Sequence, residues 1–154
     1  MSAAILAESK DLFASDEVIQ ERWRKVLNFK FDDDSAALPF TQALAFEMNW
    51  SYEFLNLAVS EYRKFMLLCS IYPGEIVPSV DVDTVWHWHL LYTRSYQQFC
   101  REALERDFLH HEPSKGGPDE DRLYAEMYEE SLSKYKRHFG PAPAEIWGPK
   151  ALEL

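Results

Sequence analysis

The chain has 154 residues, a length typical of one domain, and we expect residues 1–154 to form a single one. Apolar residues make up 47% of it and aromatic residues 15%, which excludes a disordered polymer because such a chain lacks the apolar surface to offset its ordering entropy. The formal net charge of −10 argues against nucleic acid and against anionic membranes as partners. No apolar run approaches the roughly 18 residues that a membrane-spanning helix needs.

The sequence also indicates a compartment. Cys69 and Cys100 lie far apart in the sequence and form no CxxC pair, and the first ten residues do not begin with the basic segment of a secretion signal. Free thiols without a signal favour a reducing environment, so we expect a cytoplasmic location.

Helical periodicity dominates the N-terminal half. After an acidic first turn, Ile19, Trp23 and Val26 recur at helical spacing, which predicts one helix. A short helix is expected over residues 40–48. The clearest amphipathic stripe of the chain then predicts a longer helix over residues 51–69.

The C-terminal half continues the helical pattern after a Pro/Gly-containing connector at residues 72–79. Residues 81–106 begin apolar on almost every side, so we expect a buried helix at the centre of the fold. A loop at 110–117 precedes a predicted helix over 118–139, and we expect Trp147 in the tail to pack on the core. These patterns predict an all-α fold of about five or six helices, with no sheet of more than two short strands.

The residues best suited to chemistry lie close together in the sequence. None of the common nucleotide-binding, hydrolase or EF-hand motifs is present, but four of the five histidines fall between positions 87 and 111. Imidazole, carboxylate and thiolate are the ligands that zinc prefers. Candidate ligands of a divalent metal such as zinc are Asp83, His87, His89, Cys100, His110 and His111.

Helical geometry divides these candidates. Asp83 and His87, four residues apart, share a face, whereas His87 and His89 lie about 200° apart and cannot share a metal on a regular helix. His89 follows the apolar stripe instead, which favours a buried, hydrogen-bonded histidine. Cys100 by itself is more often a small buried apolar residue than a ligand.

The length of the segment sets a further condition on a single site. If one helix ran through Arg106, His87 would lie about 28 Å from its end, and the four residues to His110 span at most about 14 Å. A site that holds His87 and a loop histidine therefore requires a break near Thr93, where a threonine can cap a second helix. Without that break, Cys100 alone is within reach of His110 and His111.

The cluster carries a family resemblance. Its residues are Val82-Asp83-x-x-Trp86-His87-x-His89-Leu90-Leu91, then Thr93, Tyr96, Cys100 and Phe108-Leu109-His110-His111. This pattern resembles the glycine-rich domain-containing protein-like family of uncharacterised bacterial proteins and larger plant proteins. The resemblance covers residues 50–148 and implies a helical core, with the helices of residues 1–49 packed on it. It implies no assigned activity and no residue roles. It does support a break at Thr93, where plant relatives can carry proline.

Three functions compete. The first is a metal-binding helical protein that uses His87, Asp83 and one of the later histidines. The second is a module that binds an unknown protein or small-molecule partner, with the His/Trp cluster as structural core. The third is a metal-assisted hydrolase, for which Glu112 is the acid beside the histidine pair.

Overall fold

A computed structural model describes residues 16–149, and this part of the chain contains seven helices and no strand. The helices are α2 (Asp16–Asn28), α3 (Phe40–Met48), α4 (Tyr52–Ile71), α5 (Val80–Leu91), α6 (Thr93–Glu102), α7 (Pro118–Phe139) and α8 (Ala144–Trp147). The all-α prediction is confirmed. The helix number exceeds the expected five or six because residues 81–106 form two helices and the tail forms a short one. The first ten residues, on which the cytoplasmic expectation partly depends, lie outside the described part.

Local capping explains where several helices begin and end. The Ser51 hydroxyl accepts a hydrogen bond from the backbone N–H of Phe54 at 3.1 Å, and the Ser79 hydroxyl accepts one from Val82 at 3.2 Å. Pro118 occupies the first position of α7, and Gly140, with a φ of 76°, ends that helix. These signals are local, which is why the sequence pattern places the same boundaries.

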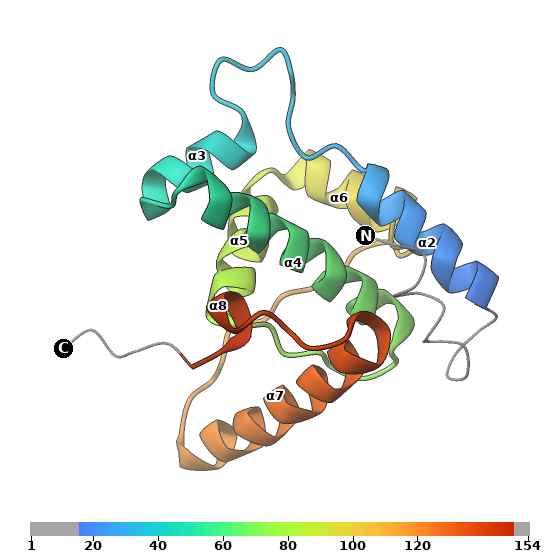
Figure 1. The fold of residues 1–154 in the computed structure, drawn as a ribbon, viewed down its shortest axis with the longest axis vertical. Coiled ribbons are helices and arrows are strands. Elements are labelled where there is room, and N and C mark those ends of the chain that lie inside the picture. The colour runs from blue at the N-terminus through green and yellow to red at the C-terminus, as the bar shows by residue number, and fades with distance from the viewer. Residues whose placement is uncertain (1–15, 150–154) are drawn as a thin grey trace.

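The centre of the fold is α4. It packs against α2, α3, α5, α7 and α8, and Figure 1 shows it crossing the middle of the molecule. Its buried side chains include Tyr62, Phe65 and Met66, all with no exposed surface. No helix of residues 16–149 combines the length and apolar character needed to cross a bilayer.

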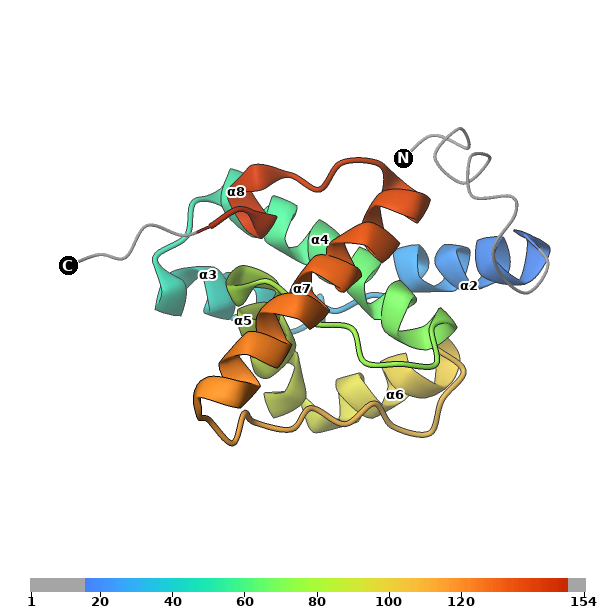
Figure 2. The same ribbon diagram turned by 90° about the horizontal axis from the view of Figure 1, so that it is seen from below.

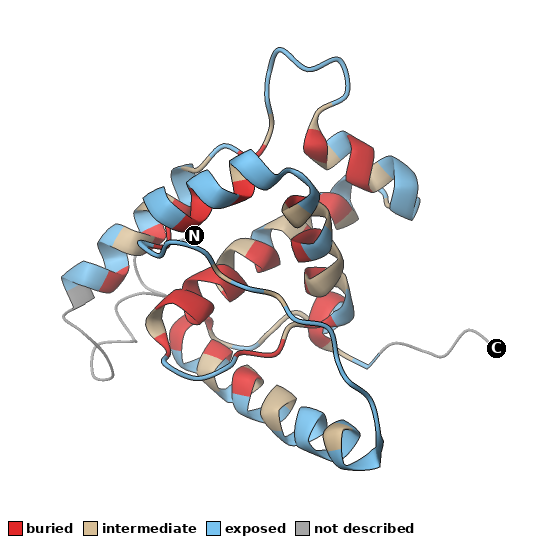
Figure 3. Ribbon diagram, turned by 180° about the vertical axis from the view of Figure 1, so that it is seen from behind, coloured by how far each residue is buried: buried red, intermediate tan, exposed pale blue. Residues whose placement is uncertain are grey.

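The position of α5 differs from the sequence-based expectation. We expected this segment at the centre, but only one face of α5 is buried, through Val82, Val85, Trp86 and His89. Val80 and Leu91 are 68% and 70% exposed on its other side. Figure 3 likewise shows buried and exposed residues alternating along several helices, and the first turns of α7 carry no buried residue. An apolar composition all round the helix therefore did not mean burial all round it.

A buried carboxylate ties the C-terminal helices to α4. Glu61, 1% exposed, accepts hydrogen bonds from Lys64 Nζ at 2.8 Å, Tyr135 Oη at 2.6 Å and Trp147 Nε1 at 2.9 Å. These bonds join α4, α7 and α8. The predicted packing of Trp147 on the core is thereby confirmed.

The chain breaks between α5 and α6, next to Thr93, where the single-site hypothesis required a break. Tyr92 leaves the helical conformation, with φ of −90° and ψ of 66°, and α6 begins at Thr93. Thr93 is thus the first residue of the helix rather than its cap, and no side-chain bond caps α6. After α6, Glu105 adopts a positive φ of 56°. The chain then returns beneath α6 to the start of α7, as the loop in Figure 2 shows.

Candidate metal centre

Three side chains from two segments meet on the outer side of α5. Asp83 and His87 lie one turn apart on α5, and His111 comes from the loop between α6 and α7. One potential ligand atom from each residue lies within 4.8 Å of the other two. The break at Tyr92 allows this convergence, because it lets the loop return to α5.

The distances within this Asp/His cluster suit a bound cation. Asp83 Oδ1 lies 2.7 Å from His111 Nε2, and Asp83 Oδ2 lies 3.8 Å from His87 Nδ1. Zinc–ligand bonds of about 2.0–2.2 Å in a tetrahedron place ligand atoms about 3.3 Å apart, a value between these two distances. A shift of less than 1 Å would therefore bring each of these two pairs to ligand spacing.

The shortest of these contacts is not a hydrogen bond. Asp83 Oδ1 and His111 Nε2 are both shielded from solvent, yet within residues 16–149 neither has a hydrogen-bond partner of acceptable alignment. A buried polar atom left in this state costs about 1–3 kcal/mol. A cation held by both atoms would remove that cost.

Two aromatic side chains, Trp86 and Tyr96, position the loop histidine His111. The His111 ring stacks on Trp86, with centroids 4.1 Å apart and planes 11° apart. Trp86 Nε1 donates a hydrogen bond to Tyr96 Oη at 2.9 Å, and the Tyr96 hydroxyl in turn donates to the carbonyl of Leu109. These contacts fix the backbone two residues before His111 and orient its ring toward Asp83.

The cluster opens onto a cleft of about 780 Å³. Asp83, His87 and His111 all line this cleft, and Tyr124 of α7 lines it as well. The exposed fraction of the side chain rises from 15% for His111 to 37% for Asp83 and 70% for His87. One side of the cluster is therefore covered by protein, and the other is accessible to a ligand.

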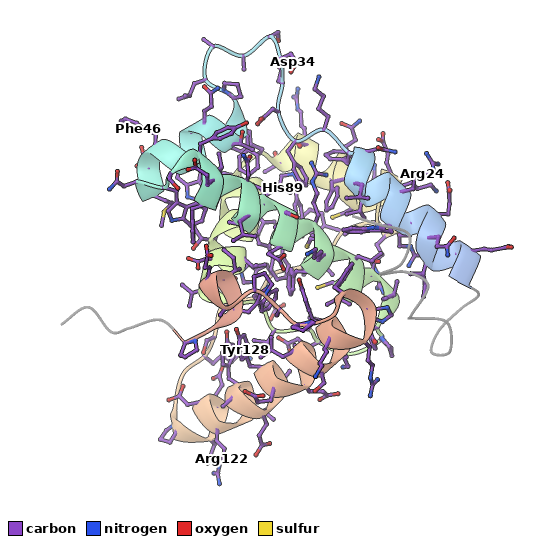
Figure 4. The ribbon with its side chains drawn as sticks, in the orientation of Figure 1. Arg24, Asp34, Phe46, His89, Arg122 and Tyr128 are labelled. Carbon is purple, nitrogen blue, oxygen red and sulfur yellow. The ribbon has the colours of Figure 1, made fainter. Side chains whose placement is uncertain are left out.

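His89 lies apart from the cluster, in the hydrophobic core. It has no exposed surface, and its Nδ1 and Nε2 atoms contact Tyr62 Oη at 2.7 Å and Ser95 Oγ at 3.2 Å. Figure 4 labels it behind α4, in the interior. Burial, followed by the nearby Arg63 charge, lowers the pKa of His89 to about 3, so the ring is neutral. Both ring nitrogens of His89 therefore make contacts inside the protein, as expected for a buried, hydrogen-bonded histidine.

The remaining candidates also lie outside the cluster. Cys100 is fully buried, and burial raises the pKa of its thiol. His110 lines the cleft, but its ring packs beside Phe108, with centroids 5.0 Å apart, and it does not join the ligand group. Of the two adjacent loop histidines, His111 is thus the one that meets Asp83.

Several cleft residues had no signal in the sequence. Glu75 comes from the connector before α5, and Glu120, Asp121 and Tyr124 come from the start of α7. They reach one cleft through tertiary packing, which no spacing rule encodes. The aromatic residues were expected in the core, and the fully buried Tyr96 does lie there, but its bond to Leu109 could not be foreseen.

Comparison with known proteins supplies the family. The model of the UCP032817-like family matches residues 17–122, while no curated protein and no solved structure matches the chain. The resemblance to the glycine-rich domain-containing protein-like family is therefore wrong as an assignment. Its motif at residues 82–91 falls inside the matched range and does not single out that family. The match also begins well before residue 50, where we expected the family-like core to begin. Because it spans well over half of the sequence, the chain belongs to the UCP032817-like family.

Proposed function

We propose that this protein binds a divalent transition metal, zinc first among them, through Asp83, His87 and His111. The observation that carries the proposal is the contact between Asp83 Oδ1 and His111 Nε2. It is 2.7 Å long, shielded from solvent and not aligned as a hydrogen bond, and a third potential ligand lies on the next turn of α5.

The ligand atoms determine which metals this site suits. Two imidazoles and one carboxylate suit zinc and ferrous iron, whereas calcium and magnesium prefer all-oxygen sites. Catalytic zinc sites and non-haem iron sites both use three protein ligands of these kinds. A hydrolytic role would add a metal-bound water and a base, and Glu112, which lines the cleft beside His111, is the candidate base.

The direct experiment is elemental analysis of protein purified without an affinity tag, followed by zinc titration of the chelator-treated protein. We expect one metal ion per chain and calorimetric binding of one zinc. His87→Ala should abolish binding without harm to the core, since this ring is 70% exposed.

His110→Ala is the matched control, because it removes an exposed imidazole from the same cleft but not from the ligand group. It should bind zinc as the unchanged chain does. Equal zinc binding by the unchanged chain and by both His87→Ala and Asp83→Asn would refute the proposed site. Failure of the unchanged chain to bind zinc or iron would favour the alternative function, an interaction module that binds a protein or small-molecule partner.

A further inference from the structure

The cleft beside the Asp/His cluster is lined by side chains of negative charge. Its walls carry carboxylates and histidines, and among residues 16–149 neither lysine nor arginine lines it. The carboxylates belong to Glu75, Asp83, Glu112, Glu120 and Asp121. Their formal charge is −5, and a divalent ion at the cluster would still leave the cleft at −3.

One of these charges is fixed by the loop itself. Glu120 Oε1 accepts hydrogen bonds from Ser114 Oγ at 2.8 Å and from the backbone N–H of Lys115 at 3.0 Å. These bonds lower the pKa of Glu120, so it stays ionised at neutral pH. The Glu120 carboxylate is therefore held in place by the loop that precedes α7.

The metal cluster itself is incomplete as a protein site. Across residues 16–149, no fourth histidine, cysteine or acidic side chain joins Asp83, His87 and His111. Structural zinc sites take four protein ligands, whereas three protein ligands leave a position for water or an added molecule. All three ligand residues line the cleft, so that position is reached from it.

Resting on the proposed metal site, we infer that the cleft takes a ligand with two features: a neutral donor atom that completes the metal's coordination, and an organic ammonium group that the carboxylates attract. Phosphorylated or carboxylate ligands are repelled, because no lysine or arginine of the described part of the chain lines the cleft to offset their charge. The ligand class is thus small amines that carry a second, metal-binding group.

The test uses the full chain loaded with cobalt(II), whose visible absorption changes when a ligand joins it. Three imidazoles with one donor and different charges serve as probes: 1-(3-aminopropyl)imidazole, the neutral 1-butylimidazole, and 3-(imidazol-1-yl)propanoate. At low salt we expect the ammonium probe to bind about tenfold more tightly than the neutral one, and the carboxylate probe more weakly than either. This preference should shrink at high salt.

Paired variants assign the preference to the cleft. The double variant Glu75→Gln with Asp121→Asn should reduce the difference in affinity between the ammonium probe and the carboxylate probe. The affinity of the neutral probe should stay unchanged. The matched control is Asp119→Asn with Glu126→Gln, which removes two exposed charges from α7 outside the cleft and should leave the difference between the charged probes intact.

The outcomes separate this inference from the proposed function. If cobalt binds but the three probes bind equally, or the carboxylate probe binds best, the inference is overturned and the metal site stands. Cobalt bands that no probe changes would mean a closed coordination sphere and would also overturn it. If the protein shows no bound cobalt, the proposed function fails and the inference fails with it.

Discussion

The imidazole of His111 lies flat against the indole of Trp86, with planes 11° apart and centroids 4.1 Å apart. One face of His111 is thus held by α5 while its Nε2 atom points to Asp83 of the same helix, 2.7 Å away. The loop and the helix are joined here by this ring stacking and by the contact between His111 Nε2 and Asp83 Oδ1. A metal ion would add coordinate bonds to the same junction.

Zinc should raise the melting temperature. At 100 times the dissociation constant, a ligand that binds only the folded state stabilises it by about 2.7 kcal/mol. Each kcal/mol shifts the melting temperature of a chain of this size by roughly 2–4 °C, which gives about 5–10 °C over chelator-treated protein. Differential scanning calorimetry with and without zinc measures the shift. His87→Ala should remove it, and a curve indifferent to zinc and chelator would support the interaction module.

Tyr96→Phe should weaken metal binding although Tyr96 touches no ligand atom of the cluster. The change removes the hydroxyl that accepts from Trp86 and donates to Leu109, so the loop that carries His111 loses its anchor. Loss of such a supporting hydrogen bond typically costs about 10–100-fold in metal affinity. Zinc calorimetry measures the change.

Tyr128→Phe is the control for this variant. It removes a phenol that likewise donates to a backbone carbonyl, that of Trp147 at 2.7 Å, away from the cluster. Its zinc affinity should match that of the unchanged chain. Equal losses in both variants would mean that the effect is general destabilisation rather than positioning of His111.

Glu61→Gln should destabilise the fold by about 3 kcal/mol or more, because it breaks a buried ion pair from one side. The neutral amide would leave Lys64 without its partner carboxylate. In either orientation its NH₂ group would face a donor, either Lys64 or the pair of Tyr135 and Trp147. Urea unfolding measures the change. Glu130→Gln, which breaks the 3.1 Å pair of a 66% exposed carboxylate with Lys134, should cost about 0–1 kcal/mol. Similar costs in the two variants would contradict this account.

Acid should weaken the fold partly through His138. Burial, and after it the Arg137 charge, lower the pKa of His138 from its ordinary value of 6.5. Below about pH 6.5, His138 therefore binds a proton in the unfolded chain but not in the folded one. The contribution of the neutral His138 to the unfolding free energy is present above that pH and is lost as the pH falls. His138→Gln keeps a polar side chain beside Tyr72 but does not titrate.

Urea unfolding of both proteins at several pH values between about 7 and 5 measures this contribution. We expect the unfolding free energy of His138→Gln to fall less over this interval. Parallel pH curves would show that His138 contributes nothing to the acid sensitivity.

Local signals account for the parts of the fold that the sequence predicted. Residues 40–48 and 118–139 match α3 and α7, because helical periodicity, Pro118 and Gly140 act within a few residues of the helix ends. The environment of α5 depends instead on which neighbours cover it. Helical spacing places Val82 and His89 on one stripe, but the apolar residues on the other side gave no sign that the face with Val80 is exposed.

The candidate site was predictable to a similar degree. The shared face of Asp83 and His87 follows from helix geometry, and the reach of the loop required the break that Tyr92 provides. The choice of His111 over its neighbour His110 depends on stacking against Trp86 and on the anchor at Leu109. Both are contacts between segments, and the sequence showed neither.

The buried carboxylate of Glu61 bears on how far this chain can be shortened. The family match ends at residue 122 and contains Glu61 and the entire Asp/His cluster, but Tyr135 and Trp147 lie beyond it. A fragment cut at the end of the match would keep every metal ligand yet leave Glu61 with Lys64 as its only remaining partner among these three donors. We therefore expect the smallest piece that folds around the cluster to extend at least to Trp147.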